Sequence, residues 1–455
     1  MRKRGSTIEL DLGELPSLPP AWRWGRIEDA ASEERNAIVD GPFGSNLKLS
    51  DYIDPPGVPV LTTANLRGDY GLHKVRYISQ SKFEELKRSE VRAGDILVAK
   101  IGSCGLTSVY PEGMPSAIIP ANLLKMTVHP EFAQKFVLYY LNSPIFSRFL
   151  EKIITATAQP AFNVSKFRQL PLPIVGRDEQ RRIVAEIEKQ FTRLEAGVSA
   201  LKRVQANLKR YRAAVLKAAC EGKLVPTEVE LAKKEKRKYE TGDELLERIL
   251  KERRKNWTGH RKCEVPVMIE TSHLPNLPEG WTWTSFDQVC ETLSDQRKKV
   301  AKTDYLVEGQ FPIIDQGEIL VGGYSNDETL LFSGKLPVIL FGDHTRRFKL
   351  AKERFIVGAD GIKIIGLTDS WDDRFLWYQF QQLKFEDRGY SRHFQFVRKA
   401  PLRLPPLVEQ RRIVAEVERR LSVVEEVEAA VSANFQRATR LRQSILQKAF
   451  SGNLV

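Results

Sequence analysis

An internal repeat restricts what this 455-residue chain can fold into more than any other feature of its sequence. The octapeptide Glu-Gln-Arg-Arg-Ile-Val-Ala-Glu starts at Glu179 and returns unchanged at Glu409. Residues 179–225 and 409–455 align without a gap, with 18 identities in 47 positions, and both stretches close on Gly-x-Leu-Val. Repetition in register over this length indicates a duplicated architecture rather than one irregular domain.

Weaker matches precede each copy of the repeat. A Leu-Pro dipeptide and a tryptophan at Trp22 correspond to the same features at Trp281, and Phe162 matches Phe394 at an offset of 232. The sequence therefore predicts five segments in the order globular, helix, linker, globular, helix. They are a first globular domain at 1–178, a long helix at 179–225, a charged linker at 226–276, a second globular domain at 277–408 and a second long helix at 409–455.

Apolar residues in the two long segments recur at a mean spacing of 3.5 residues, which is the period of a coiled-coil seam. The predicted seam residues are Ile187, Phe191, Leu194, Val198, Leu201 and Leu208 in the first helix, and Val417, Leu421, Val424, Val431, Leu441 and Ile445 in the second. Glu428 and Asn434 interrupt the second series. These polar residues either fix the register of a helix pair or face water on a rotated helix.

Two long helices in one chain are expected to pair with each other. Antiparallel pairing is preferred, because the linker then need not run back along the helix, and it would place the globular domains at opposite ends of a rod. The linker itself reads as one short helix around 245–250 within mobile, charged chain. The predicted fold class is α+β, with two globular α/β domains, each followed by a long helix of an antiparallel coiled coil.

Both globular segments show mixed α/β patterning. Continuous apolar runs predict strands at 96–99 and 117–119 in the first, and at 338–341 and 362–365 in the second. Helical periodicity covers about 131–151 and 372–384.

The net charge of +13, with an isoelectric point near 9.4, suggests an acidic partner such as nucleic acid, or else a basic surface kept for solubility. Residues 179–225 carry 11 basic and 5 acidic residues, so nearly half of the excess lies on the first helix. The excess charge is therefore associated with the first long helix, and with whatever binds along it, at least as much as with the globular domains.

Catalytic and metal-binding signatures do not occur in the sequence. It has no P-loop, no Asn-Pro-Pro-Tyr-type tetrad and no HExxH, and the pair His260 and Cys263 has no second pair of ligands. We therefore predict no catalytic residues, no metal and no cofactor on this chain. The four cysteines form no CxxC pair, and the sequence contains neither a secretion signal nor a long apolar run, so we expect a cytoplasmic protein.

Polar and basic residues gather in loops, several of which follow predicted strands. Such loops suit contacts to phosphates and base edges, although each residue alone could equally serve a tight turn. The candidate DNA-binding residues are Phe43, Ser45, Lys48, Lys100, Ser103, His344, Thr345, Arg346, Arg347, Ser391, Arg392 and His393.

The whole frame resembles the specificity subunits of type I restriction-modification enzymes. The resemblance rests on both Leu-Pro…Trp-x-Trp openings, the Gly-Pro-Phe-Gly-Ser run at 41–45, Gly-Asp-Ile-Leu at 94–97, Phe162-Asn163 and the Gly-x-Leu-Val closes. It implies two target recognition domains that each read half of a bipartite site on double-stranded DNA. It also implies a subunit without catalysis that recruits two methyltransferase subunits and restriction subunits. S-adenosylmethionine, ATP and Mg would then be bound by those partners.

Two other functions stay open at this point. One is a coiled-coil adaptor whose end domains bind proteins. The other is a metal-dependent nuclease built on Asp343, Asp360 and Lys363, although the acid usual two residues before the lysine is replaced by Gly361.

Overall fold

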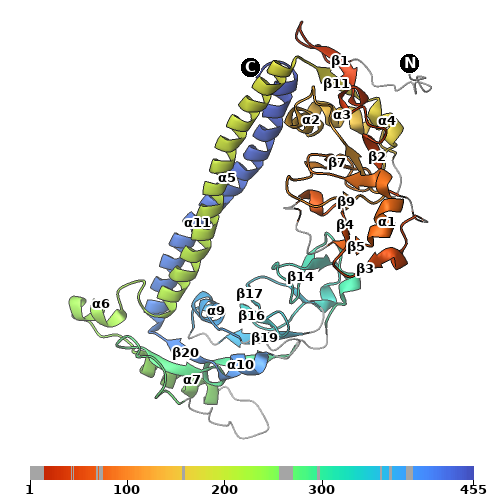
Figure 1. Ribbon diagram of the computed structural model, residues 1–455. Helices are drawn as coiled ribbons and strands as arrows, with labels where there is room; N and C mark the ends of the chain where they lie inside the picture. Colours follow the sequence, from red (N-terminus) through yellow and green to blue (C-terminus); the bar gives the residue numbers. More distant parts are fainter. Residues whose placement is uncertain are drawn as a thin grey trace. The chain divides into compact units, whose positions relative to one another are not determined.

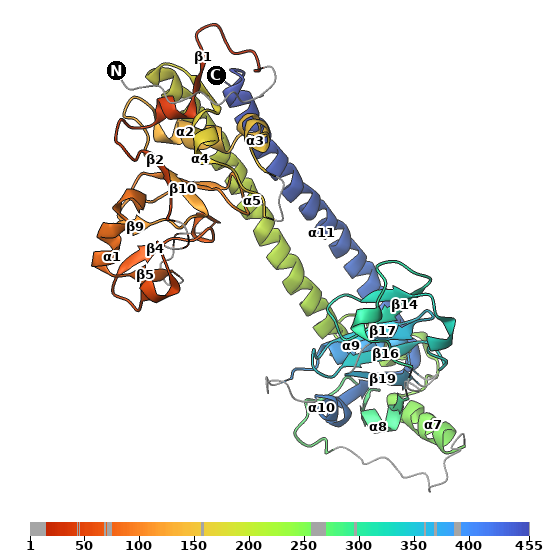
Figure 2. The ribbon, with the colours of Figure 1, turned by 90° about the vertical axis from the view of Figure 1, so that its right-hand side faces the viewer.

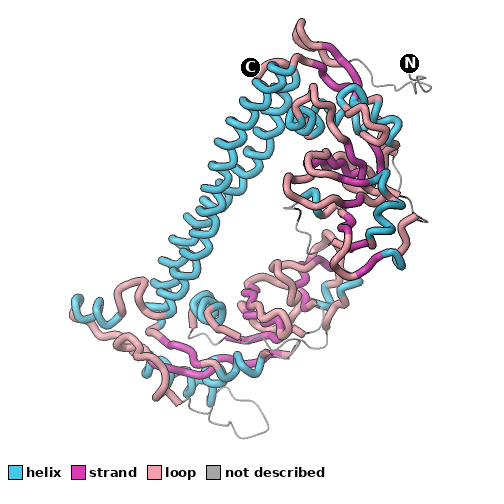
Figure 3. Tube along the Cα trace, viewed as in Figure 1, coloured by secondary structure: helices cyan, strands magenta, loops and turns pink. Residues whose placement is uncertain are grey.

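The computed structural model describes residues 15–42, 44, 46–67, 70, 75–155, 159–255, 270–294, 298–358, 361–367, 371–385 and 393–454. The chain packs as two compact units. Unit 1 comprises Met1–Lys202 with Ser432–Val455, and unit 2 comprises Arg203–Val431. Each long helix therefore contributes one part to each unit. Figure 3 shows the helices, strands and loops in different colours.

Unit 1 is built on three sheets. The antiparallel pair is β1 (Arg23–Arg26) with β11 (Pro171–Ile174). The four-stranded sheet runs in the order β2 (Ile38–Asp40), β10 (Leu123–Met126), β7 (Ile96–Ala99), β8 (Thr107–Val109). The five-stranded sheet runs β3 (Tyr52–Ile53), β5 (Arg76–Ile78), β4 (Val58–Val60), β9 (Ala117–Ile118), β6 (Glu90–Val91). The predicted strands at 96–99 and 117–119 are confirmed as β7 and β9, and both are buried.

The helices of unit 1 are α1 (Gln80–Glu85), α2 (Gln134–Leu141), α3 (Pro144–Glu151), α4 (Val164–Arg168), the start of α5 (Arg177–Cys220) and the end of α11 (Leu407–Phe450). Short 3-10 turns lie at 27–30, 49–51, 65–67 and 87–89. The helical pattern expected at about 131–151 is confirmed and is divided into α2 and α3: the Ser143 side chain accepts a hydrogen bond from the Phe146 N–H at 3.2 Å, and Pro144 begins the second helix.

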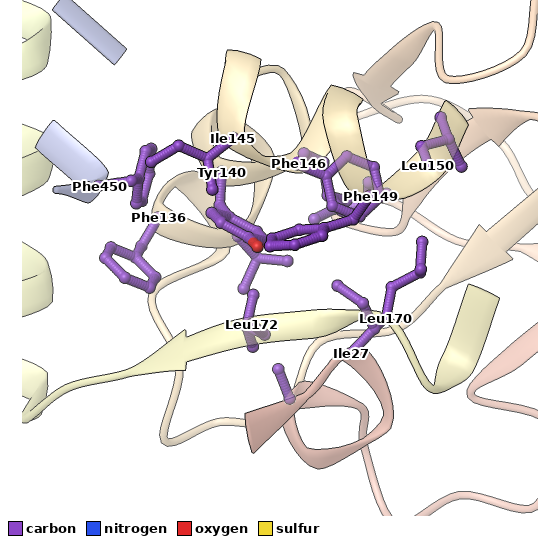
Figure 4. Packing of buried hydrophobic residues seen from close by; sticks show 14 of the residues in the cluster. Ile27, Phe136, Tyr140, Ile145, Phe146, Phe149, Leu150, Leu170, Leu172 and Phe450 are labelled. Atoms are coloured by element: carbon purple, nitrogen blue, oxygen red, sulfur yellow. The ribbon is translucent and has the colours of Figure 1, made fainter. Parts of the chain in front are cut away.

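The core of unit 1 includes the far end of the chain. Phe450 of α11 is fully buried, with its ring centroid 5.2 Å from that of Phe136 and 5.2 Å from that of Tyr140 (Figure 4). Ile183 and Ile187 from the start of α5 belong to the same cluster. The first globular fold is therefore completed by residues from both long helices.

Unit 2 repeats the plan with different contents (Figure 1). The antiparallel pair is β12 (Thr282–Ser285) with β20 (Pro401–Leu404), and the four-stranded sheet runs β13 (Cys290–Leu293), β19 (Ile362–Leu367), β16 (Val338–Gly342), β17 (Phe348–Ala351). A three-stranded sheet runs β15 (Gly323–Ser325), β14 (Phe311–Ile314), β18 (Ile356–Val357). The strands expected at 338–341 and 362–365 are confirmed.

The helices of unit 2 are the end of α5, α6 (Glu228–Glu235), α7 (Gly242–Lys255), α8 (Phe286–Val289), α9 (Asp373–Gln381), α10 (Phe394–Lys399) and the start of α11. Two 3-10 turns lie at 302–304 and 328–330. The helix expected at 372–384 is confirmed in the shorter form of α9.

The structural equivalence of the two units corrects one sequence match. Asn163 and His393 are the N-cap residues of α4 and α10, and Pro171 and Pro401 begin β11 and β20. The offset of 230 seen in the long helices therefore reaches back to these elements. The match of Phe162 to Phe394, at an offset of 232, is two residues out of register.

The linker is more ordered than its charge suggested. In the described part, α7 packs Leu245 and Ile249 into the core of unit 2, where both are buried. The carboxylate of Glu228 in α6 is also buried and is ion-paired with Arg237 and Arg412. The short helix predicted around 245–250 is thus confirmed within α7, but the mobile chain expected before it is wrong, because α6 forms there, and residues 256–269 lie outside the described range.

Contacts between α5 and α11 occur within each unit. In unit 1, Arg442 pairs with Glu195 at 3.4 Å, and its guanidinium lies 4.1 Å from the centroid of the Phe191 ring. In unit 2, Arg212 donates to Glu428 at 3.1 Å. Figure 2 shows the two helices side by side in both units. The first half of α5 therefore contacts the second half of α11 in unit 1. In unit 2 the second half of α5 contacts the first half of α11.

Burial along the predicted seam is uneven. Buried seam residues are Ile187, Phe191, Val417, Val424, Val431 and Ile445, and half-buried ones are Leu194, Val198, Leu201, Leu208 and Leu421. Leu441 is 48% exposed. The predicted seam is thus buried at some of its positions and partly open to solvent at others. Within the described part of the chain, none of the helices is long and apolar enough to cross a membrane.

Candidate functional site

In unit 2, three loops converge around the turn between β16 and β17. Lys349 on β17 donates to the main-chain oxygen of Asp315 at 2.7 Å and also to that of Ile319, which holds the 315–320 loop beside the turn. A Cβ added to Gly361 would meet both His344 and Gln316 at about 3 Å, so the turn at 361 approaches the same place. Burial lowers the pKa of the Lys349 ammonium, although Asp315 partly opposes this.

The candidate residues of this turn differ in exposure. Thr345 and Arg347 are exposed, and the Arg347 guanidinium pairs with Glu318 at 2.5 Å. His344 and Arg346 are half-buried, and Arg346 has a positive φ of 60°, which marks the tight turn. These four residues therefore lie together at one loop cluster, as predicted from their position after a strand.

His393 belongs to the scaffold of this cluster. It is 1% exposed, its backbone N–H donates to the Asp343 carboxylate at 2.7 Å, and its Nδ1 lies 3.1 Å from the Asp343 carbonyl oxygen. The same carboxylate accepts from the Phe394 N–H at 2.8 Å. The side chain of His393 is therefore inside the fold rather than at a surface, which corrects its prediction as a base contact. Ser391 and Arg392 lie outside the described residues.

Asp343, like His393, stabilises the fold of this loop cluster. Its carboxylate is buried and occupied by the two N–H groups at the start of α10, where it replaces a side-chain cap. Asp360, the second acid of the nuclease hypothesis, lies outside the described residues. Among the described residues, no group of three or more His, Cys, Asp or Glu is placed to hold a metal ion.

In unit 1, the loop after β7 occupies the equivalent position. Ser103 accepts a hydrogen bond from Arg67 at 2.8 Å, and the Gly102 N–H donates to the Pro160 oxygen at 2.8 Å. Lys100, in contrast, is 5% exposed and its Nζ lies 2.6 Å from Asp40 Oδ2. The position of Lys100 at a strand end suggested an ammonium exposed at the surface. That expectation is wrong, because Lys100 forms a buried ion pair with Asp40.

The glycine-rich loop at 41–48 is described only in part. Phe43 and Ser45 lie outside the described residues, whereas Lys48 is exposed ahead of a 3-10 turn. Gly41 is required here, because an added Cβ would lie 2.1 Å from the Ile119 carbonyl oxygen. The loop thus starts at a fixed backbone contact with the five-stranded sheet.

The sequence pattern missed a group of charged residues in unit 1. Asp40, Arg88 and Arg168 line a cavity of about 550 Å³ together with Lys100. These residues are far apart in sequence, and neither spacing nor a motif links them. The weak available signal was two basic residues, Lys166 and Arg168, in α4, the short helix that precedes β11.

Comparison with known proteins gives a consistent result. Residues 44–202 match the family model of the type I restriction modification DNA specificity domain. The chain is 24% identical over 304 residues to the type I restriction enzyme EcoDI specificity subunit of Escherichia coli, covering 63% of this chain and 62% of that protein. It is also 24% identical over 172 residues to the EcoBI specificity subunit of the same organism, covering 37% and 36%. The chain thus spans less than two thirds of the length of these relatives.

A solved structure shares the fold. A chain from a study of complex assembly and conformational transition of the type I R-M system superimposes with a TM-score of 0.59 at 19% identity. The superposition covers 96% of this chain and 99% of that one. The architecture of two globular folds and two long helices is therefore one already known.

Proposed function

Since the chain belongs to the specificity-subunit family of type I restriction-modification systems, we propose that it selects the DNA target of such a system and is not itself catalytic. Each globular unit reads one half of a bipartite duplex target. The observation that carries this proposal is the repetition of one scaffold with different loops. The order β2-β10-β7-β8 recurs as β13-β19-β16-β17, but the loop after β7 holds Lys100 and Ser103, whereas the loop after β16 holds His344 to Arg347.

The spacer is proposed to be an antiparallel coiled coil of α5 and α11. The reversed contacts in the two units support this, namely Glu195 with Arg442 and Arg212 with Glu428. In such an arrangement the length of the helices sets the separation of the two half-sites, as dimer geometry does in other DNA-binding proteins. Residues outside the loops position the duplex through its phosphates, and loop side chains contact base edges.

We further propose that the chain recruits two methyltransferase subunits and restriction subunits in the cytoplasm. S-adenosylmethionine, ATP and Mg are bound by those partners in this proposal. Co-purification of tagged chain with its methyltransferase subunit, followed by mass measurement of the complex, tests the expected stoichiometry of one to two.

The decisive experiment is methylome sequencing of cells that express the chain together with its methyltransferase partner. A single bipartite motif with methylated adenine is the expected result. Replacing residues 338–367 of unit 2 by the same region of a relative should change one half of that motif and leave the other half intact. Methylation without any bipartite motif, or purified complex without preference among duplexes, would favour the adaptor function instead.

A further inference from the structure

The cavity of about 550 Å³ in unit 1 includes one of the candidate loop residues, Lys100, but most of its lining comes from other elements. It lies where the end of β2, the turn at 87–89, the loop after β7 and α4 meet. The residues that line it are Ile38, Asp40, Arg88, Lys100, Ile153, Thr155, Ala161, Phe162, Asn163, Val164, Ser165, Lys166 and Arg168.

The charges around this cavity do not balance. Four of the described lining residues are cationic and one, Asp40, is acidic. Asp40 is shared, because Lys100 approaches it at 2.6 Å and Arg88 at 3.5 Å. One carboxylate neutralises one positive charge, so the lining keeps a surplus of three. Positive groups that converge on a concave, partly enclosed space raise the local concentration of anions.

The surplus is a property of unit 1 and not of the shared scaffold. At the offset of 230, Arg168 corresponds to Arg398, whose guanidinium is engaged by both oxygens of Asp287 at 2.8 and 2.9 Å. Lys166 corresponds to Phe396. The two cations of α4 therefore correspond in α10 to an ion-paired arginine and a phenylalanine. If these cations only stabilised the scaffold, both units would need them.

The residue types favour phosphate over other anions. Guanidinium groups bind phosphate oxygens through paired N–H donors, and lysine adds a mobile point charge. Ser165 is exposed at the rim and carries a hydroxyl donor. The volume accommodates a phosphate with its attached sugar. We infer that this cavity is a phosphate-binding site and that, resting on the proposed function, it receives one backbone phosphate of the bound duplex.

The site would position the duplex without reading its sequence, since phosphate carries no base information. Lys100 and Asp40 form its floor, with side chains only 7% and 12% exposed. Arg88 and Lys166 stand nearer the opening, and the Arg88 side chain is 66% exposed. Removing these two charges therefore disturbs the ligand more than the fold.

The test compares the full chain with the double variant Arg88→Gln, Lys166→Gln. Binding to an unrelated duplex is measured by fluorescence anisotropy over a series of salt concentrations. Loss of one phosphate contact lowers the slope of log K against log salt by about 0.9 and weakens binding equally for all sequences. The control is Arg23→Gln, Arg35→Gln, which removes two exposed charges of unit 1 away from the cavity and should leave the slope unchanged. Equal melting temperatures establish that each variant is folded.

A second arm uses inorganic phosphate as the probe, titrated into the same proteins by calorimetry. An unchanged salt slope with phosphate binding lost in the double variant would assign the cavity to a free phosphate compound and overturn the DNA contact. No effect in either arm would overturn the phosphate site itself. Failure of the proposed function is seen separately, as a parent chain that binds all duplexes alike, because the slope can be measured on any duplex.

Discussion

The burial of Phe450 in the first globular fold gives a sharp test of how the units are built. The Phe450→Ala substitution removes a fully buried ring from the end of α11. A buried Phe→Ala change costs about 3–5 kcal/mol. The upper part of that range applies here, because two edge-to-face ring contacts, to Phe136 and Tyr140, are lost as well.

The expected effect is local to unit 1. At about 1.4 kcal/mol per factor of ten, a loss of about 4 kcal/mol raises the opening equilibrium of the unit roughly a thousandfold. Hydrogen exchange read by mass spectrometry reports this directly. Peptides covering α2 should exchange faster by that factor, limited by the stability of the parent unit, whereas peptides covering α9 in unit 2 should be unchanged.

Two controls accompany the measurement. Leu441→Ala lies on the same helix, but its side chain is 48% exposed, so a change below about 1 kcal/mol is expected. Cys220 is the repeat equivalent of Phe450 and is buried in unit 2, so Cys220→Ala should affect α9 peptides and spare α2. If Phe450→Ala behaves like Leu441→Ala, the packing of α11 into unit 1 is wrong.

Substitutions at three further positions test the site and the linker. Asp343→Ala should cost about 2–3 kcal/mol of unit 2 stability, because the N–H groups of residues 393 and 394 lose their buried acceptor, and Asp343→Asn, which keeps an acceptor oxygen, should restore part of it in urea unfolding. Gly41→Ala should lower the melting temperature of unit 1 without altering unit 2, since a Cβ cannot stand 2.1 Å from a carbonyl oxygen; an unchanged melt would contradict the close approach. Burial acts to raise the pKa of Glu228, but hydrogen bonds and charge from Arg237 and Arg412 outweigh it and leave that pKa lowered. The stability that this carboxylate contributes is therefore present above its unfolded pKa of about 4.3 and is lost as the pH falls through the lower folded value, so Glu228→Gln should destabilise the chain at pH 6 and differ less from the parent at pH 4.

The sequence was informative about repeated and strongly patterned elements. The strands at 96–99 and 338–341 are continuous apolar runs, and such runs belong to strands that are covered on both faces. The long helices were predictable from their period, including the seam residues that meet a globular core. The short helix predicted around 245–250 is part of α7, but the charge of the linker hid α6 and the burial of Leu245 and Ile249, which stand one helical turn apart.

The spacing of residues along the sequence could not predict whether a loop side chain points into the fold or toward the surface. Lys100 follows an expected strand and His393 was expected in a loop, yet both are buried by partners 60 and 50 residues away in sequence. A position at a strand end says that a loop begins there, not whether its first side chain turns inward. The same limit applies to the cavity in unit 1, whose charges come from separate elements.

Completion of unit 1 by α11 also bears on the order of events during synthesis. The ribosome releases residues 1–202 long before it makes residues 445–450, which fill the hydrophobic cluster around Phe136 and Tyr140. The nascent first fold must therefore wait with an apolar surface uncovered while all of unit 2 is translated. Unit 2 has no such delay, because its share of both helices lies within one continuous stretch, Arg203–Val431.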